Sequence, residues 1–430
     1  MKKYIEYAIT DIPWLTELPS HWSLFRAKRL FSNPKEKNEN NNEKNILSLT
    51  LNGVIRNDVD NPIGLSPSDY STYQIFEKDN LVFKLIDLEN ISTSRVGLVP
   101  ERGIMSSAYI RFVARCNLNI RYFYTYFYSL WLRNIFNGLG AGVRQTLSST
   151  ELLDIKIPVP PRAEQDQIVR FLDWKTAKID KLIEGYQKQI ELLEEQRQTV
   201  IDEAVIHGID KAELKPSGTN WVSQIPIHWE MVFSKKLFAE RKDKAFPDDE
   251  QLTASQKYGI ITQREFMERE QRRVTVVMKG DDILKHVGKG DFVISMRSFQ
   301  GGLEYSYVEG KISSAYVMLI PRSEKVYDEY FKWLLKSRPY IKALQGTADL
   351  VRDGQALRYA NFAKVPLPIV PIEEQKRIAN YIISEIKKID KTIPVIHKQI
   401  ALLKEYRTRL ISDVVTGQID VRDEVIPEMR

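Results

Sequence analysis

Two long stretches of the chain carry apolar residues at helical spacing. In residues 164–206, apolar side chains recur every three, four or seven positions, and glutamate, glutamine, lysine and arginine occupy the other face. This apolar stripe consists of Ile179, Leu182, Ile183, Tyr186, Ile190, Leu193, Val200, Ile201, Ala204 and Val205. The stretch contains no proline and a single glycine, Gly185. We therefore predict one helix of about 65 Å, at ~1.5 Å per residue.

A second stretch near the C-terminus repeats this pattern. Its stripe contains Ile389, Ile393, Ile396, Ile400, Leu403, Leu410, Ile411, Val414 and Val415, with Thr392 in the place of Leu182. Both stretches follow proline-rich runs, at 158–161 and 366–368, and both end before a glycine, Gly208 or Gly417. Two matching amphipathic helices most simply pack together, and the repeat favours an antiparallel pair. Pro394 should remove one backbone hydrogen bond and kink the second helix.

The repeat extends from the helices to the rest of the chain. Residues 14–22 and 221–229 share tryptophan, proline, histidine and tryptophan at equivalent positions, a shift of 207. The pair Glu164-Gln165 recurs as Glu374-Gln375, and matches continue through the helices at a shift of 210. Repeats of this length indicate a duplicated structural unit. The two halves are therefore predicted to be related by a pseudo-twofold axis.

The inserts between the shared segments are typical of mixed α/β domains. In each half we expect two short strands followed by an aromatic-rich helix. These elements are 81–83, 108–113 and 121–136 in the first half, and 292–294, 315–320 and 327–344 in the second. Each insert spans roughly 125 residues, enough for its own core. Residues 33–105 cannot be aligned with 240–312 without inventing gaps, so the inserts are expected to differ. The charged run 264–273 predicts an exposed helix.

The predicted fold class is α+β, with two mixed α/β domains joined by two long antiparallel, coiled-coil-like helices in a pseudo-twofold repeat. The expected boundaries are 1–157 for the first domain, 158–210 for the first helical spacer, 211–367 for the second domain, and 368–430 for the second helical spacer and the C-terminal tail.

Composition narrows the functional classes. The chain has 63 Lys+Arg against 57 Asp+Glu, and a net charge of +6 is compatible with a nucleic-acid partner without establishing one. The single cysteine, Cys116, excludes an internal disulfide and a cysteine-cluster zinc site, and we expect it to fill the core. Five scattered histidines argue against a metal site. We expect no signal peptide, and the most apolar stretch, 122–132, is too short to span a bilayer. The expected location is the cytoplasm.

Familiar catalytic motifs are missing from the sequence. It contains no Walker A motif, no Asn/Asp-Pro-Pro-Tyr/Phe methyltransferase tetrapeptide and no convincing acidic-Glu-x-Lys nuclease constellation. The glycine-rich run 138–142 follows a helix-like segment rather than a strand, so we interpret it as a turn. His21 and His228 adjoin tryptophans in both repeats, but we find no carboxylate at a comparable place in both copies. We interpret them as packed or capping side chains, and we expect a non-catalytic chain.

The order of these motifs resembles the specificity (S) subunits of type I restriction–modification enzymes. The resemblance rests on Trp-x-x-x-x-Pro-x-His-Trp at the start of each half and on the ends of the two helices, 205–210 and 415–420. It also rests on Pro-x-Pro-Pro-x-x-Glu-Gln, which spans 158–165 and recurs with altered proline spacing at 366–375. It covers essentially the whole chain.

The resemblance implies that the two domains are target recognition domains, each of which reads one half of a split, asymmetric sequence in double-stranded DNA. The helices would set the number of unread base pairs between the halves. Two methylation (M) subunits and two restriction (R) subunits are the implied partners, with no membrane involved. S-adenosylmethionine, ATP and magnesium would belong to those partners, so no cofactor or metal is expected in this chain.

The residues expected to contact DNA lie in the divergent connections and after the glycine loops. Arg144 and Arg352 follow the loop in both halves, and a position shared by unlike domains is better suited to phosphate than to bases. Gln145 is a candidate base contact, because a glutamine side chain can form two hydrogen bonds with the edge of an adenine. The equivalent position in the second half is occupied by Asp353. The candidates in the divergent connections are Lys84, Asn90, Arg95, Arg297 and Gln300.

Two other functions are compatible with the sequence. An interaction scaffold, in which the helices tether two protein-binding domains, predicts no salt-dependent DNA affinity in the presence of its partner. The chain is also compatible with a split piece of a fused restriction–methylation enzyme. A neighbouring reading frame that encodes the methyltransferase tetrapeptide would decide between a separate subunit and the fused form.

Overall fold

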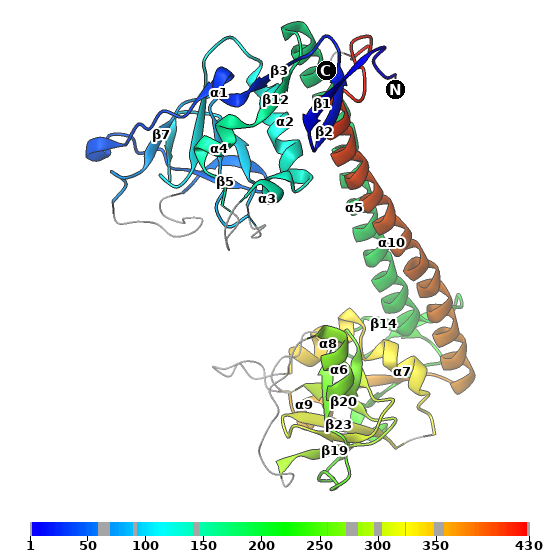
Figure 1. The fold of residues 1–430 in the computed structure, drawn as a ribbon. Coiled ribbons are helices and arrows are strands. Elements are labelled where there is room, and N and C mark those ends of the chain that lie inside the picture. The colour runs from blue at the N-terminus through cyan, green and yellow to red at the C-terminus, as the bar shows by residue number, and fades with distance from the viewer. Residues whose placement is uncertain are drawn as a thin grey trace. The chain divides into compact units, whose positions relative to one another are not determined.

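The computed structural model describes residues 2–58, 69–88, 93–140, 146–255, 257–271, 283–295, 303–322, 324–347 and 357–427. The chain divides into two compact units, each containing one mixed α/β domain and parts of both long helices (Figure 1). The first unit comprises Met1–Tyr186 and His397–Arg430, and the second comprises Gln187–Ile396.

The two long helices are α5 (Arg162–His207) and α10 (Ile372–Val415). Asp180 pairs with Arg407 at 2.9 Å in the first unit, and Arg197 pairs with Asp390 at 3.5 Å in the second. From one pair to the other, the α5 residue advances by 17 positions and the α10 residue retreats by 17. The helices are therefore antiparallel, and the two ion pairs are one interaction repeated by the duplication.

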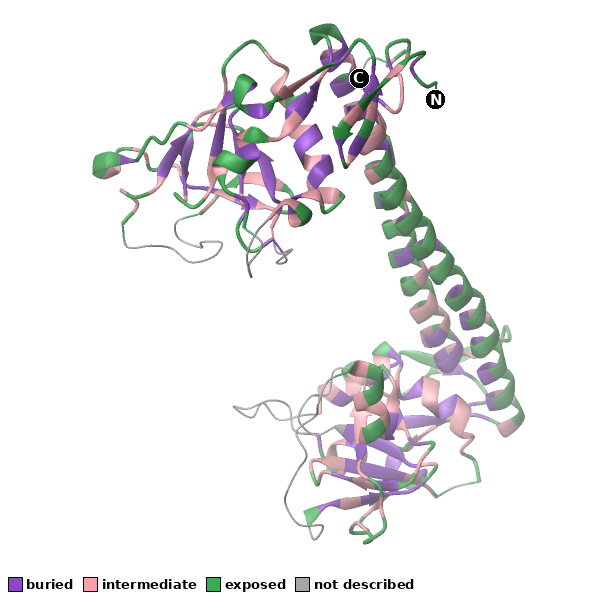
Figure 2. Ribbon diagram, in the orientation of Figure 1, coloured by how far each residue is buried: buried purple, intermediate pink, exposed green. Residues whose placement is uncertain are grey.

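Burial along α5 and α10 agrees with the predicted stripes except at one position. Ile179, Ile183 and Ile190 of α5 are buried, but Leu182 is 54% exposed, so its predicted place in the stripe was wrong. Most of the outer faces of the pair are exposed, whereas burial is concentrated in the sheets of each domain (Figure 2). The predicted ends are confirmed, because Gly208 and Gly417 follow the helices with φ of 76° and 75°.

Helix α10 continues through Pro394. A proline inside a helix leaves one carbonyl without its usual donor and costs about 3 kcal/mol relative to alanine. We expect Pro394→Ala, at an exposed position, to stabilise the second unit by about 1–3 kcal/mol, measured by urea unfolding. Lys391→Ala, one turn earlier, is the matched control and should change little. A destabilised Pro394→Ala variant would show that the packing requires the proline.

The first domain consists of short strands and helices around one four-stranded sheet. Its strands are β1 (Tyr7–Ile12), β2 (Leu15–Pro19), β3 (Ser23–Arg26), β4 (Phe31–Ser32), β5 (Leu47–Thr50), β6 (Gly53–Arg56), β7 (Gln74–Phe76), β8 (Leu81–Phe83), β9 (Val96–Leu98), β10 (Gly103–Met105), β11 (Ile110–Ala114) and β12 (Lys156–Val159). Its helices are α1 (Ala27–Leu30), the 3₁₀ turn η1 (Glu39–Asn41), α2 (Ile120–Leu132), α3 (Ile135–Leu139) and α4 (Ser149–Asp154).

The second domain has a corresponding set of elements. Its strands are β13 (Leu214–Pro216), β14 (Gln224–Pro226), β15 (Glu230–Phe233), β16 (Phe238–Arg241), β17 (Leu252–Ser255), β18 (Gly259–Thr262), β19 (Lys285–Val287), β20 (Phe292–Ser295), β21 (Glu304–Tyr305), β22 (Gly310–Ile312), β23 (Tyr316–Pro321) and β24 (Pro366–Ile369). Its helices are η2 (Ser234–Lys236), α6 (Gln263–Glu270), α7 (Asp328–Leu334), α8 (Arg338–Gln345) and α9 (Tyr359–Phe362).

The two domains share one topology, including the inserts that could not be aligned. The four-stranded sheets have the orders β4-β11-β8-β9 and β16-β23-β20-β21. The two-stranded pairs also correspond: β1-β2 with β13-β14, β3-β12 with β15-β24, β5-β6 with β17-β18, and β7-β10 with β19-β22. All of these strand pairs are antiparallel. The divergent inserts are therefore variants of one fold.

Aromatic side chains fill equivalent places in the two cores. Phe31 lies 5.4 Å from Phe123 between ring centroids, and its repeat counterpart Phe238 lies 5.4 Å from Phe331. All four rings are fully buried. Large rings contribute much buried area, and edge-to-face packing adds to it. The repeat therefore preserves the central packing of each domain.

Several predicted elements are confirmed and others need correction. The predicted strands appear as β8, β11, β20 and β23, and the exposed charged helix appears as α6. The aromatic helices are each broken in two. Asn134, with φ of 57°, separates α2 from α3, and Pro339 lies in the first turn of the new helix α8. Cys116 is exposed, so its predicted core role was wrong.

Candidate nucleic-acid interface

A buried carboxylate at the start of α5 joins the first domain to the helix pair. Glu164 accepts hydrogen bonds from Tyr4 Oη and from Trp22 Nε1 at 3.0 Å, and His21 Nε2 lies 2.9 Å from its other oxygen. The Glu164 side chain is only 5% exposed. Burial and then the Glu164 carboxylate raise the pKa of the Tyr4 hydroxyl, which stays protonated and donates.

The second unit repeats this carboxylate site at the start of α10. His228 Nε2 lies 2.8 Å from Glu374 Oε2, and Trp229 Nε1 donates to the same oxygen at 3.2 Å. Our inference that no carboxylate occupies a comparable place in both copies was wrong. Glu164 and Glu374 are equivalent by the repeat. The partners were missed because the histidine and glutamate lie 143 residues apart in the first copy.

The glutamine that follows each glutamate fixes the domain helix to the long helices. Gln165 Oε1 accepts from Asn119 N at 3.0 Å, at the start of α2, and Gln375 Oε1 accepts from Tyr327 N at 2.9 Å, before α7. Buried tyrosines complete the joint: Tyr122 donates to Val415 O at 3.0 Å, and Tyr330 donates to Val205 O at 2.8 Å. The repeated motifs are therefore structural anchors, and recognition must rest on other residues.

Two of the eight predicted DNA contacts lie in the part of the chain that the structure describes. Arg95 is 1% exposed, and its guanidinium donates to Asp87 O at 2.7 Å and Ile86 O at 3.5 Å. Lys84 N bonds Arg95 O at 3.1 Å, which joins the two ends of this connection. Burial lowers the pKa of both side chains, and the Arg95 charge lowers that of Lys84 further. Arg95 thus supports the connection, and DNA contact by either residue stays a prediction.

The remaining predicted contacts lie outside the described residues. They are Asn90, Arg144, Gln145, Arg297, Gln300 and Arg352. Their predicted roles therefore remain predictions.

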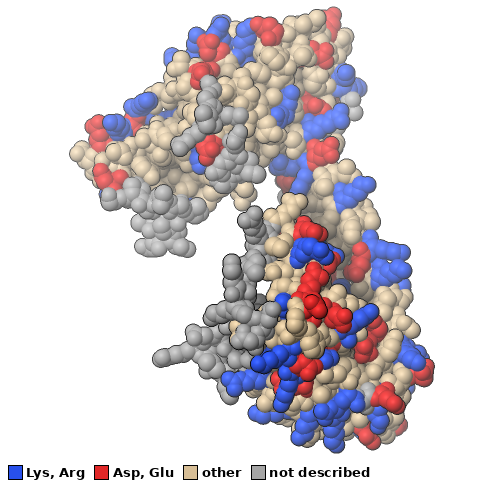
Figure 3. Space-filling model, turned by 60° about the horizontal axis from the view of Figure 1, so that its bottom comes forward, with Lys and Arg blue, Asp and Glu red and all other residues tan. Residues whose placement is uncertain are grey.

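Charge on the visible surface is mixed. On the face shown in Figure 3, lysine and arginine are interspersed with aspartate and glutamate. A net charge of +6 over 430 residues agrees with this pattern. DNA affinity would therefore have to come from local clusters of lysine and arginine rather than from a positive electrostatic potential over the whole surface.

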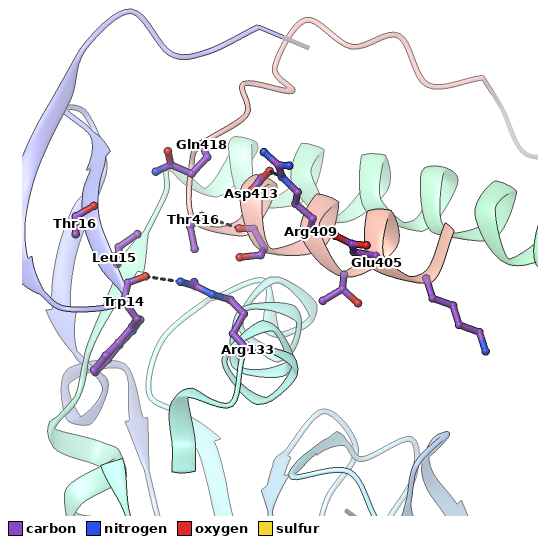
Figure 4. A pocket seen from close by; sticks show the side chains of 12 residues that line it. Trp14, Leu15, Thr16, Arg133, Glu405, Arg409, Asp413, Thr416 and Gln418 are labelled. Atoms are coloured by element: carbon purple, nitrogen blue, oxygen red, sulfur yellow. Dashed lines mark hydrogen bonds and ion pairs between the residues drawn. The ribbon is translucent and has the colours of Figure 1, made fainter. Parts of the chain in front are cut away.

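The first unit contains a pocket of about 640 Å³ beside the repeated tryptophan Trp14. Figure 4 shows Arg133 pointing toward the N-terminal hairpin, where it donates to Trp14 O at 2.9 Å, while Arg409 and Asp413 of α10 form an ion pair at 3.4 Å. Glu405 also lines the pocket. Its acidic and basic side chains are mixed, so the pocket does not match a polyanion.

In the second unit, a larger cleft of about 890 Å³ lies between the turn that carries Trp221 and helix α8. Among the described residues that line it, the charged ones are all basic: Arg338, Lys342 and Lys364. It is the better match to an anionic ligand.

Two searches of the described residues bear on other classes of function. They contain no group of three or more histidine, cysteine, aspartate or glutamate side chains placed to hold a metal ion. Within the same residues, no helix has both the length and the apolar character needed to cross a membrane.

The family model and the similar proteins all indicate the same family. The model described as "Type I restriction modification DNA specificity domain" matches the chain twice, at residues 21–192 and 226–405. The chain is 25% identical over 295 residues to a putative type I restriction enzyme MjaX specificity subunit of Methanocaldococcus jannaschii, covering 67% of this chain and 66% of the relative. It is 24% identical over 373 residues to the MjaVIII specificity subunit of the same organism, covering 81% of each. The match to the MjaX subunit thus spans just under two thirds of that relative.

Solved structures support the fold. A chain from a study of complex assembly and conformational transition in a type I R-M system superimposes with a TM-score of 0.65 at 15% identity, covering 94% of this chain and 99% of the other. The HsdS subunit from Thermoanaerobacter tengcongensis superimposes with a TM-score of 0.50, also at 15% identity, covering 94% and 98%.

Proposed function

Because the chain belongs to the family of type I restriction–modification DNA specificity domains, we propose that it reads a bipartite, asymmetric DNA sequence and directs partner subunits to it. Each α/β domain contacts one half of the target. The observation that carries this proposal is the identical sheet order of two domains whose inserts differ in sequence. Two domains of the same fold provide one binding domain for each half-site. Because their inserts differ in sequence, the two domains are suited to half-sites of different sequence.

The proposed partners are two methylation subunits and two restriction subunits. Exposed leucines at equivalent positions of the two helices support two copies of one partner: Leu192 of α5 is 61% exposed and Leu402 of α10 is 54% exposed. Isolated exposed leucines are common, but this pair presents the same apolar side chain at two positions related by the repeat. The catalytic steps, with S-adenosylmethionine, ATP and magnesium, belong to those partners in this proposal, and this chain supplies DNA recognition only.

Genome-wide methylation tests the proposal. The chain would be co-expressed with its neighbouring methylation subunit in a methylation-free host, and the modified bases would be located by sequencing. We expect one split motif with methyladenine in each half. The methylation subunit expressed alone is the control and should leave the genome unmodified. A stable complex of the two proteins without new methylation would refute the proposal and favour the scaffold alternative.

A further inference from the structure

The basic cleft of the second unit includes residues that lie close in the sequence to Arg352, a residue predicted to contact DNA. Its walls are the 218–221 turn, helix α8 and the segment before β24. Gly346 and Thr347 line it, and Arg352, a predicted phosphate contact, lies five residues after Thr347 in the sequence.

The cleft holds two cations whose charge is not balanced by a described carboxylate. Arg338 forms a bidentate pair with Glu195, at 2.8 and 2.9 Å, so its charge is largely neutralised. Lys342 and Lys364 are exposed, and neither has an ion-pair partner among the residues that the structure describes. These two lysines are therefore available to an anion.

A hydrogen bond and ring packing hold the walls of the cleft together, and the cleft has room for a ligand. Trp221 Nε1 donates to Pro366 O at 3.0 Å, and its ring packs edge-to-face on Tyr340 at 5.7 Å between centroids. Small residues line the opening. A Cβ atom built on Gly218 would meet no other atom within 4 Å, and Ala343 lies on the facing helix.

The first unit has a smaller basic hollow, in which most of the cations have an ion-pair partner among the described residues. This hollow, of about 420 Å³, is lined by Arg26, Lys28, Arg29 and Lys156. Asp154 pairs with both Arg26 and Lys28, the latter at 2.7 Å, and Asp11 pairs with Lys156 at 2.5 Å. Three of the four cations of this hollow have an ion-pair partner among the described residues, whereas only Arg338 of the three cations in the cleft of the second unit has one.

We propose that Lys342 and Lys364 bind a backbone phosphate of duplex DNA and so fix the position of the second domain on its half-site. The inference rests on the proposed function and adds a phosphate site to it. Two lysines in a walled cleft neutralise a phosphate without reading a base, and such contacts set position and orientation. An acidic peptide of a partner would meet the same charges. DNA is favoured because the proposed function places this domain on DNA, whose backbone phosphates complement the positive charge of the cleft.

The salt dependence of DNA binding tests this site. The complex with the methylation subunit is titrated with duplexes that contain or lack its methylation motif, over a range of salt concentrations. For Lys342→Gln/Lys364→Gln, the slope of log K against log salt should become shallower by ~0.9, because one phosphate contact is lost. Affinity should fall by the same factor for both duplexes. Ala343→Leu, which adds bulk to the wall of the cleft and keeps the charges, should also weaken binding of both duplexes.

Lys289→Gln, in the turn between β19 and β20, is the matched control and should leave the slope unchanged. Two results would overturn the inference while the proposed function stands: an unchanged slope in the double variant, or a loss confined to the duplex that contains the motif. A weaker complex with the methylation subunit, at an unchanged DNA slope, would instead assign the cleft to an acidic protein surface. A wild-type complex that does not distinguish the two duplexes would refute the proposed function itself.

Discussion

Replacement of Glu164 by alanine is expected to destabilise the first unit by about 3 kcal/mol and to leave the second unit unchanged. The variant leaves the Tyr4 hydroxyl and the Trp22 indole N–H buried without their acceptor, and it removes the carboxylate beside His21. A hydrogen bond to a charged group contributes about 1.5–3 kcal/mol, and a buried donor that loses its partner keeps its desolvation penalty. Hydrogen exchange would show faster exchange in β1, β2 and the end of α10.

One further variant separates the charge from the hydrogen bonds, and another tests the equivalent anchor of the second unit. Glu164→Gln retains an acceptor for Tyr4 or Trp22, so we expect a smaller loss, of about 1 kcal/mol. Glu374→Ala should accelerate exchange in the second unit instead, near Trp229 and β15. Equal destabilisation of both units by either alanine variant would contradict the assignment of one anchor to each domain.

The helices were predictable because their signal is local and long. Burial of Ile179, Ile183 and Ile190 follows directly from the apolar period, and Gly208 marks the end of α5 with its positive φ. Leu182 shows the limit of this reasoning. Apolar residues at three- and four-residue spacing cover a wider arc of the helix than a two-helix contact buries, so the edge of the stripe remains exposed.

The anchors and the common topology were harder to obtain from one sequence. The equivalence of Glu164 and Glu374 was visible in the repeat, but their contacts with histidine and tryptophan depend on the tertiary fold. The matching sheets were hidden because strands of three residues, such as β9 and β10, carry too few positions to show an alternating pattern. The break between α7 and α8 had a local signal, since Pro339 favours the first turn of a new helix.

The recognition residues were the least predictable part. The sequence around Arg95 contains nothing to show that its guanidinium turns inward to the carbonyls of Asp87 and Ile86. An arginine in a divergent connection has the same local sequence whether it supports the loop or contacts a base. Lys342 and Lys364 were not singled out, because their common cleft forms only when α8 packs beside the segment that precedes β24.

A chain that carries the first domain twice should direct methylation by its partner subunit to an inverted repeat. In this chimera, a copy of residues 23–159 replaces residues 230–369, so that the antiparallel pair β3-β12 takes the place of β15-β24. Both junctions then join equivalent strands, and the anchors to α5 and α10 are retained. Because each domain is anchored in the same way to one end of an antiparallel helix pair, two identical domains should read one half-sequence in opposite orientations.

The expected result is complete loss of methylation at the original asymmetric motif and its appearance at a palindrome built from the first half-sequence, detected by sequencing the host genome. The reciprocal chimera, with residues 230–369 in both positions, is the matched control and should give a palindrome of the other half-sequence. Retention of the original motif by either chimera would show that the replaced domain does not read DNA. Two different palindromes, each matching one half of the original target, would assign one half-site to each domain, because only the exchanged domain differs between the chimeras.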